Sequence, residues 1–147
     1  MTAADVRDRL AGLIGKRIAS IRRLLYVSAG SVQSEVGPIE IAFSDDSTFL
    51  FNIGSDGESL RLDEAQWHDP FEEPLSPENR RFVERSGKVT AFDMSSVRPY
   101  DKLIGRTVLD VQPIVGPLNK ITGAAVVTDA GMIRVATAAD EVLVDIA

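Results

Sequence analysis

Carboxylates are the most plentiful side chains with chemical potential in this sequence, which contains 22 Asp and Glu residues, one His and no Cys. A metal site would therefore have to be built from carboxylate and carbonyl oxygens, which suit Ca²⁺ or Mg²⁺. Asp45-Asp46 and Asp56-Gly57-Glu58 are too sparse for an EF-hand loop and are typical of turns. We predict no metal site and no cofactor.

Catalytic side chains do not form a recognisable constellation. A serine hydrolase needs a serine, a base and an acid within mutual reach, and His68 is the sole candidate base. Its neighbour Asp69 is not an obvious orienting acid, and no Gly-x-Ser-x-Gly elbow or phosphate-binding glycine loop is present. A carboxylate pair could perform acid–base chemistry, but the abundance of carboxylates gives such a pair little weight. The sequence favours a protein that is not an enzyme.

The segment from Glu64 to Leu75 is the best candidate for a binding site. It combines the only Trp and the only His with carboxylates and prolines, and it contains no basic residue. Aromatic anchors with a carboxylate rim suit a basic protein partner, because the aromatics hold the complex and the charges steer encounter. The predicted partner-binding residues are Trp67, Asp69, Phe71, Glu72 and Glu73. The alternative is that Trp67 and Phe71 pin this loop to the core.

A second charged group comprises Lys16, Arg17, Arg22 and Arg23. These residues could bind an anionic ligand. We favour the interpretation that they protect the edge of a sheet, because charged side chains on an edge strand discourage aggregation.

The elements that position these residues are written twice along the chain. The string from Leu13 to Ile21 matches the string from Leu103 to Val111 at an offset of 90 residues. Phe43 then matches Val127 at an offset of 84, and Leu60–Asp63 matches Val142–Asp145 at an offset of 82. A shrinking offset indicates shorter loops in the second copy, since loops tolerate deletion better than strands do. The pattern predicts a tandem repeat.

Each copy has the pattern of a short helix followed by an antiparallel meander. In the first copy Val6, Leu10, Leu13 and Ile14 form an apolar helical stripe that should end at Gly15. Period-2 alternation then predicts strands. The second copy should begin with a helical turn over residues 100–104. The hairpin residues expected to share a buried face are Ile41, Phe43, Phe49 and Phe51 in the first copy and Ala125, Val127, Ile133 and Val135 in the second.

A connector over residues 64–99 should join the first copy, residues 1–63, to the second copy, residues 100–147. Ser76 and Pro77 are typical of a helix start, with Phe82 and Val83 as apolar anchors and an end near Gly87. Residues 88–92 suggest one more short strand. We predict an α+β fold with two pseudo-symmetric copies in one compact domain.

Charge and composition restrict the partners and the compartment. The formal net charge of -6 disfavours nucleic acid, whose phosphates are bound by clustered Lys and Arg. No apolar stretch approaches the roughly 20 residues needed to cross a membrane, and residues 1–15 lack the pattern of a signal peptide. The absence of cysteine is typical of a reducing compartment. We expect a cytoplasmic protein with neither a membrane nor a nucleic-acid partner.

In its general character the chain is similar to small acidic immunity proteins, which neutralise a bacterial toxin by binding it. The likeness is one of composition, and it implies a non-enzymatic inhibitor of a cationic protein. A self-associating scaffold, such as a homodimer formed through sheet edges, is the first alternative. A small carboxylate-dependent enzyme with a groove between the two copies is the second.

Overall fold

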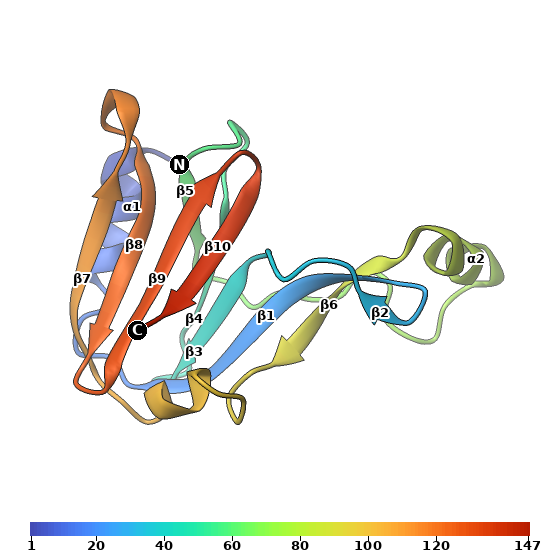
Figure 1. Ribbon diagram of the computed structural model, residues 1–147, viewed down its shortest axis with the longest axis horizontal. Coiled ribbons are helices and arrows are strands. Elements are labelled where there is room, and N and C mark those ends of the chain that lie inside the picture. The colour runs from blue at the N-terminus through green and yellow to red at the C-terminus, as the bar shows by residue number, and fades with distance from the viewer.

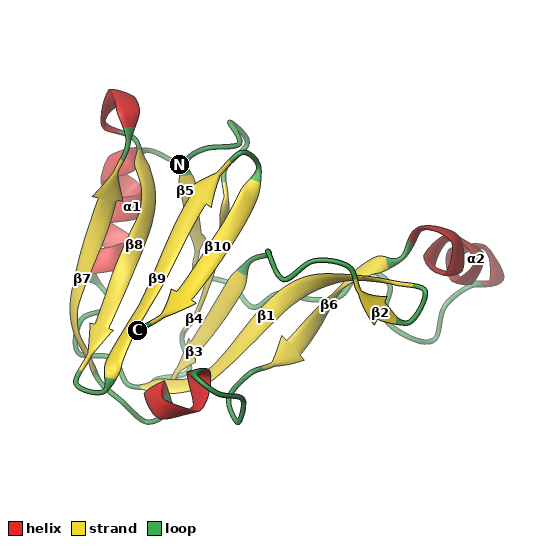
Figure 2. Ribbon diagram, in the orientation of Figure 1, coloured by secondary structure: helices red, strands yellow, loops and turns green.

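The structure, a computed structural model, describes residues 1–147 and is an α+β fold with two antiparallel sheets (Figures 1 and 2). The predicted fold class is confirmed. The first part of the chain contains α1 (Ala3–Ala11), β1 (Ile18–Ser28), β2 (Ser31–Val32), β3 (Ile39–Phe43), β4 (Thr48–Ile53) and β5 (Leu60–Asp63). The second contains α2 (Pro77–Ser86), β6 (Lys88–Asp93), η1 (Tyr100–Leu103), β7 (Val108–Val115), η2 (Pro117–Asn119), β8 (Ile121–Thr128), β9 (Gly131–Ala138) and β10 (Glu141–Ile146).

Both sheets contain a four-strand meander. The larger sheet has the order β2-β1-β3-β4-β5, with β6 on the other side of β1, and the smaller has the order β10-β9-β8-β7. The sheets pack face to face, and 22 buried residues from both sheets, α1 and η1 form one hydrophobic core. Ile41, Phe43, Phe49 and Phe51 all lie in this core, as the alternation predicted. Neither α-helix is long and apolar enough to cross a membrane.

Helix α1 begins with a capping box, in which Thr2 and Asp5 each accept a hydrogen bond from the other's backbone N–H. Val6 and Leu10 are buried as expected, but the helix ends at Ala11 and not at Gly15. The residues after Ala11 form a turn, so their side chains no longer follow the spacing of the helix. Leu13 stays buried, whereas Ile14 is 47% exposed, so its assignment to the apolar stripe was wrong.

The two copies meet at an isolated antiparallel bridge between Arg17 and Thr107. Four backbone hydrogen bonds surround this bridge, and they form two pairs. Within each pair, the donor of one bond and the donor of the other are equivalent residues of the two copies, 90 positions apart, and so are the acceptors. The first pair is Gly15 N–H to Val108 C=O (2.8 Å) with Gly105 N–H to Ile18 C=O (2.7 Å). The second is Ile18 N–H to Arg106 C=O (2.9 Å) with Val108 N–H to Lys16 C=O (2.8 Å). This reciprocity supports the predicted repeat.

The register of β8 differs by one residue from the sequence alignment of the copies. Ile41 lies opposite Phe49, and the corresponding pair in the smaller sheet is Val126 opposite Ile133. Ala124 and Val126 therefore enter the core beside Ile133 and Val135, as the alternation predicted for the latter two. The prediction that Ala125 and Val127 share this face was wrong, although Ala125 is buried on the other face. A slip of one residue moves every side chain of a strand to the other face. The equivalent offset for this strand is 85, not 84.

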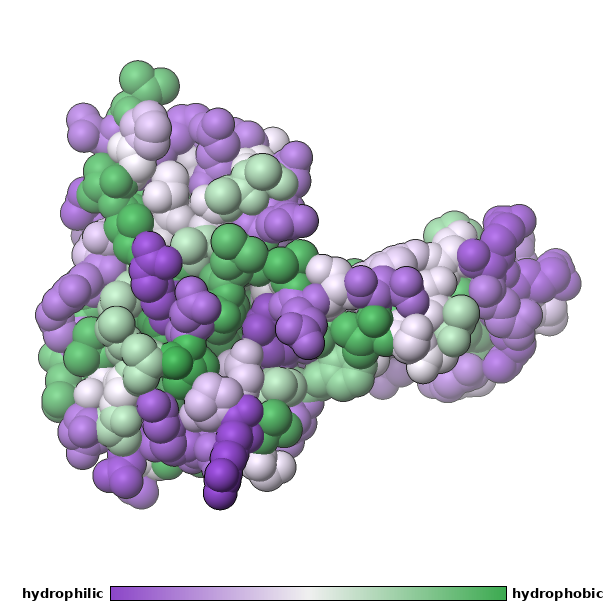
Figure 3. Space-filling model, in the orientation of Figure 1, coloured by the Kyte–Doolittle hydropathy of each residue, from purple (hydrophilic) through white to green (hydrophobic).

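An arm projects from the body of the molecule and carries α2 at its far end (Figure 1). We define the arm as residues 24–36 and 66–93. It forms because β1 pairs with β3 over its first half and with β6 over its second half. No arm residue belongs to the hydrophobic core, and α2 buries none of its residues. The space-filling view shows hydrophilic residues crowded at the far end of the arm (Figure 3).

The basic residues of β1 do not protect a sheet edge, because β1 is an interior strand. The preferred interpretation of Arg22 and Arg23 was therefore wrong. Arg22 pairs with Glu40 on the outer face of the larger sheet. Arg23 is buried on the opposite face and donates to the Tyr100 hydroxyl (2.9 Å) and to the carbonyls of Glu35 and Gly37.

Candidate protein-interaction site

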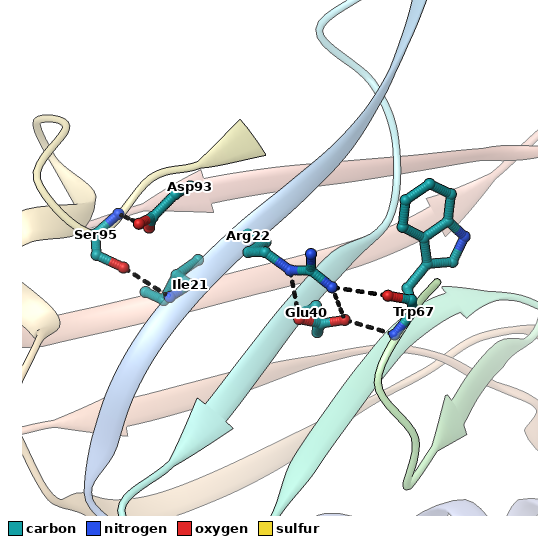
Figure 4. A network of polar contacts seen from close by, with 6 residues as sticks. All are labelled: Ile21, Arg22, Glu40, Trp67, Asp93 and Ser95. Atoms are coloured by element: carbon teal, nitrogen blue, oxygen red, sulfur yellow. Dashed lines mark hydrogen bonds and ion pairs between the residues drawn. The ribbon is translucent and has the colours of Figure 1, made fainter. Parts of the chain in front are cut away.

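A buried polar network fixes the main chain of the connector at Trp67 (Figure 4). The Arg22 guanidinium donates to both Glu40 carboxylate oxygens, at 2.7 and 2.8 Å, and to the Trp67 carbonyl at 2.9 Å. The Trp67 backbone N–H in turn donates to Glu40 Oε2 at 2.7 Å. Three residues from distant parts of the chain are thus joined by four hydrogen bonds.

The strand pleat explains why Glu40 is available for this network. Its neighbours Ile39 and Ile41 point into the core, so Glu40 points to the outer face of the sheet, directly opposite Arg22 on β1. The connector then covers the pair, leaving Glu40 only 4% exposed. Burying a carboxylate is costly unless it is paired and hydrogen-bonded, as it is here. The network therefore tethers the connector firmly to the sheet.

Asp69 provides a second attachment, between the connector and the start of β6. Its carboxylate accepts from Lys88 Nζ at 2.5 Å and from the Phe71 backbone N–H at 2.8 Å. Desolvation alone would raise the pKa of Asp69, but these two hydrogen bonds outweigh it and hold the pKa below its ordinary value. Both carboxylate oxygens of Asp69 thus take part in internal contacts.

Acidification should release this second attachment. Because the pKa of Asp69 is lowered in the folded protein, the contact contributes fully above the ordinary Asp pKa of about 4 and is lost as pH falls through the lowered value. Trp67 is the only tryptophan, so fluorescence excited selectively at tryptophan reports on this segment. We expect a fluorescence change below pH of about 4. In Asp69→Asn the spectrum should be shifted already at neutral pH, and identical titration curves for both proteins would contradict this assignment.

Phe71 links the connector to α2. Its ring stacks on the ring of Phe82 with centroids 5.4 Å apart and an interplanar angle of 20°. Ser76 caps α2 by accepting from the Asn79 N–H at 3.1 Å, as the sequence predicted, and Gly87 ends the helix with a positive φ of 76°. Phe71 is half-buried and Phe82 is exposed, so the stack holds the helix while leaving aromatic surface accessible.

Trp67 stands between two hollows of about 290 Å³ each. The apolar hollow is lined by Leu24, Pro38, Asn52, Trp67, Pro70, Phe71, Lys88 and Val89. The polar hollow is lined by Arg22, Gln66, Trp67, His68, Asp69, Glu72, Thr90 and Ala91. Sites for small molecules usually start at roughly 300 Å³, so each hollow is better suited to individual side chains.

The two glutamates differ in their freedom. Glu73 accepts from the Leu75 N–H at 3.1 Å and pairs with Arg80 at 3.0 Å, and these contacts lower its pKa. Glu72 is exposed and has no ion pair. Arg22 pairs with Glu40, Lys88 with Asp69 and Arg80 with Glu73, so each of these carboxylate charges is balanced by its own basic partner. Glu72 is therefore the uncompensated charge of the polar hollow.

The predicted partner-binding residues lie in one segment but have different surroundings; they are Trp67, Asp69, Phe71, Glu72 and Glu73. Trp67 and Phe71 are half-buried, which differs from the full burial expected of residues that only pin a loop. Sequence reasoning did not predict that Arg22, Glu40 and Lys88 hold the segment, although it had singled out Arg22 for another role. The pattern Ile39-Glu40-Ile41 marked Glu40 as an outward residue, but no local signal showed that a segment almost 30 residues away would cover it.

Core side chains fill the space between the two sheets. A hollow of about 530 Å³ lies elsewhere, between the N-terminal part of α1 and the β4–β5 turn with β5 itself. All of the carboxylates with shifted pKa values have lowered ones, whereas the groove-enzyme alternative requires raised ones. No cluster of three or more His, Asp or Glu residues has a geometry that could hold a metal ion.

No protein-family model, curated protein or solved structure matches this chain. A function must therefore be argued from the geometry of the site, since a fold by itself does not fix a function.

Proposed function

We propose that the protein is a non-enzymatic binding module whose connector surface, centred on Trp67 and Glu72, holds a basic protein partner. An inhibitor of a cationic protein, of the kind that immunity proteins represent, is the leading form of this proposal. The observation that carries it is a half-buried tryptophan fixed between two side-chain-sized hollows, on an arm outside the core cluster.

Preorganisation is the first argument. The Arg22–Glu40 pair already holds the Trp67 main chain, so a partner would meet an ordered anchor. Binding then costs less conformational entropy than it would if the loop had to be ordered at the same time. Tryptophan is also among the residues that most often dominate the binding energy of an interface.

Charge is the second argument. The chain has a formal net charge of -6, and Glu72 is uncompensated at the polar hollow. A basic partner would be attracted over a Debye length of about 8 Å at physiological ionic strength. A basic side chain could then pair with Glu72, while an apolar neighbour enters the apolar hollow.

Affinity capture with matched baits tests the proposal. The full chain and a Trp67→Ala, Glu72→Gln double variant are immobilised and exposed to extracts of the cells that produce the protein. We expect a basic protein to be retained by the natural chain and lost with the variant. Glu141→Gln, a variant with the same change in charge on the exposed end of β10, should retain it. Identical sets of retained proteins on all three baits would refute the proposed site.

The binding kinetics of the retained partner should separate the two roles. Glu72→Gln should lower mainly the association rate at low salt, because it removes a steering charge. The Glu72→Gln, Glu73→Gln pair should add little to this, since Glu73 is already paired with Arg80. Trp67→Ala should instead raise the dissociation rate, because it removes the anchor. Stopped-flow or surface-based kinetics at two salt concentrations measures both, and a Glu72→Gln effect that is independent of salt would exclude steering.

A further inference from the structure

Strand β6 is an edge strand whose outer side has no partner. It pairs with β1 in unbroken register, from Asp93 opposite Arg22 to Lys88 opposite Val27. No backbone group of β6 forms a hydrogen bond on the other side. In Figure 1 β6 crosses β1 within the arm, and its C-terminal half emerges below β1.

The hydrogen bonds to β1 reveal which backbone groups of β6 are free. The Met94 N–H donates to the Ile21 C=O at 2.8 Å, and therefore points toward β1. Backbone groups alternate in direction along an antiparallel strand, so Thr90 and Phe92 also point toward β1. The N–H and C=O groups that point outward belong to Val89, Ala91 and Asp93.

Apart from the charged residues at its two ends, Lys88 and Asp93, this edge lacks the devices that usually protect an edge strand, which are charge, proline, a bulge, very short length or a cover. The other edges of the molecule have them. Strand β2 has two residues, β5 has four and its Leu62 carbonyl accepts from Arg9, β7 contains Pro113 and is bonded to the Lys16 main chain at its start, and β10 accepts a hydrogen bond from Gly37. The centre of β6 is the uncharged run Val89-Thr90-Ala91-Phe92. An added strand is the natural partner for such an edge.

The polar hollow borders the same strand. Thr90 and Ala91 point to opposite faces of the sheet, yet both line this hollow, which indicates that it reaches the β6 backbone. Trp67 and Glu72 line it from the connector. Exposed Asp93 lies on the same face, since it is opposite Arg22. Side chains that an added strand directs to this face would meet two carboxylates and an indole ring.

We propose that the partner adds an extended strand to β6, with its main chain bonded to Val89, Ala91 and Asp93 and with basic side chains directed toward Trp67 and Glu72. This inference rests on the proposed function, because it specifies how the basic partner is held. A second copy of the chain is the weaker occupant, since two chains of net charge -6 repel each other.

Amide exchange on the full chain tests the proposal, with a synthetic octapeptide of alternating Lys and Val as the probe. The peptide should slow exchange of the Val89, Ala91 and Asp93 amides, while the Thr90 and Phe92 amides, already bonded to β1, should not change. Ala91→Pro removes only an outward N–H, and proline is tolerated at such positions of edge strands. It should weaken peptide binding about tenfold, as expected for the loss of a backbone hydrogen bond together with closer steric contact. Ala91→Ser keeps the amide and should bind as the natural chain does.

The results that would contradict strand addition can be told apart from those that would contradict the proposed function. Peptide binding that leaves the three outward amides unprotected would overturn strand addition and leave the proposed function standing. Failure of the peptide to bind would also overturn strand addition, while capture of a basic protein would still support the proposed function. Protection that grows with protein concentration in the absence of peptide would assign the edge to a second copy. The exchange pattern of the natural chain decides these outcomes even if Ala91→Pro disturbs folding.

Discussion

Phe51→Ala is expected to lower the free energy of unfolding by about 3 to 5 kcal/mol, one of the two largest effects that we predict for a single substitution. Phe51 is 0% exposed and lies on β4, opposite Ile39 on β3 and Leu62 on β5. Removing its ring would leave a cavity at the centre of the larger sheet, where strands on both sides prevent collapse. The midpoint of urea unfolding measures the change.

A pair of neighbouring substitutions provides the control for this prediction. Val126 lies in the core and Val127 faces outward, so Val126→Ala should destabilise the protein more than Val127→Ala does. The face predicted by aligning the two copies in sequence would give the reverse order. A near-neutral midpoint for Phe51→Ala, or a larger effect at Val127, would mean that the side-chain faces are inverted.

Glu40→Ala should produce the second large effect, a loss of about 3 to 5 kcal/mol, because removing one partner leaves the other members of a buried network uncompensated. Arg22 would lose a bidentate carboxylate, and the Trp67 N–H would lose its acceptor. The connector would then lose its main attachment to the sheet. Urea unfolding should show the destabilisation, and Trp67 fluorescence should shift to longer wavelength before global unfolding.

Glu40→Gln is the matched control, because it keeps the size and one hydrogen-bond acceptor and removes the charge. It should be less damaging than Glu40→Ala and should leave the Trp67 spectrum closer to that of the natural chain. If Glu40→Ala unfolds at the natural midpoint with unchanged fluorescence, the connector is held by something other than this network.

Alternation and turn residues were enough to predict most of the fold. The strands over residues 39–43, 49–53 and 141–146, the helix capped by Ser76 and the turn before Gly105 all follow from local patterns, and each is present. These features are local because a strand shows its buried face within five residues and a cap acts over one turn.

The parts that could not be predicted depend on contacts between distant segments. The face of β8 depends on where the second copy is shorter: Phe43 corresponds to Thr128 and Phe49 to Ile133, so the missing residue lies in the turn after β8, and the sequence alignment had placed it before this strand. The arm exists because β6 pairs with β1 more than 60 residues away, so Arg22 and Arg23 are interior although their charge is typical of an edge. The candidate site was found by its composition, whereas its support by Glu40 and Lys88 required the tertiary fold.

One measurement tests most directly the claim that the connector surface binds the partner. It is the equilibrium affinity, at low salt, of the captured basic partner for the Trp67→Ala, Glu72→Gln double variant. If the connector surface is the binding site, the loss of a tryptophan anchor should weaken binding by roughly thirtyfold or more, which corresponds to about 2 kcal/mol. The loss of the Glu72 charge should add to this at low salt and less so at high salt. Affinity equal to that of the natural chain, in a variant whose unfolding midpoint is unchanged, would contradict the claim that this surface binds the partner.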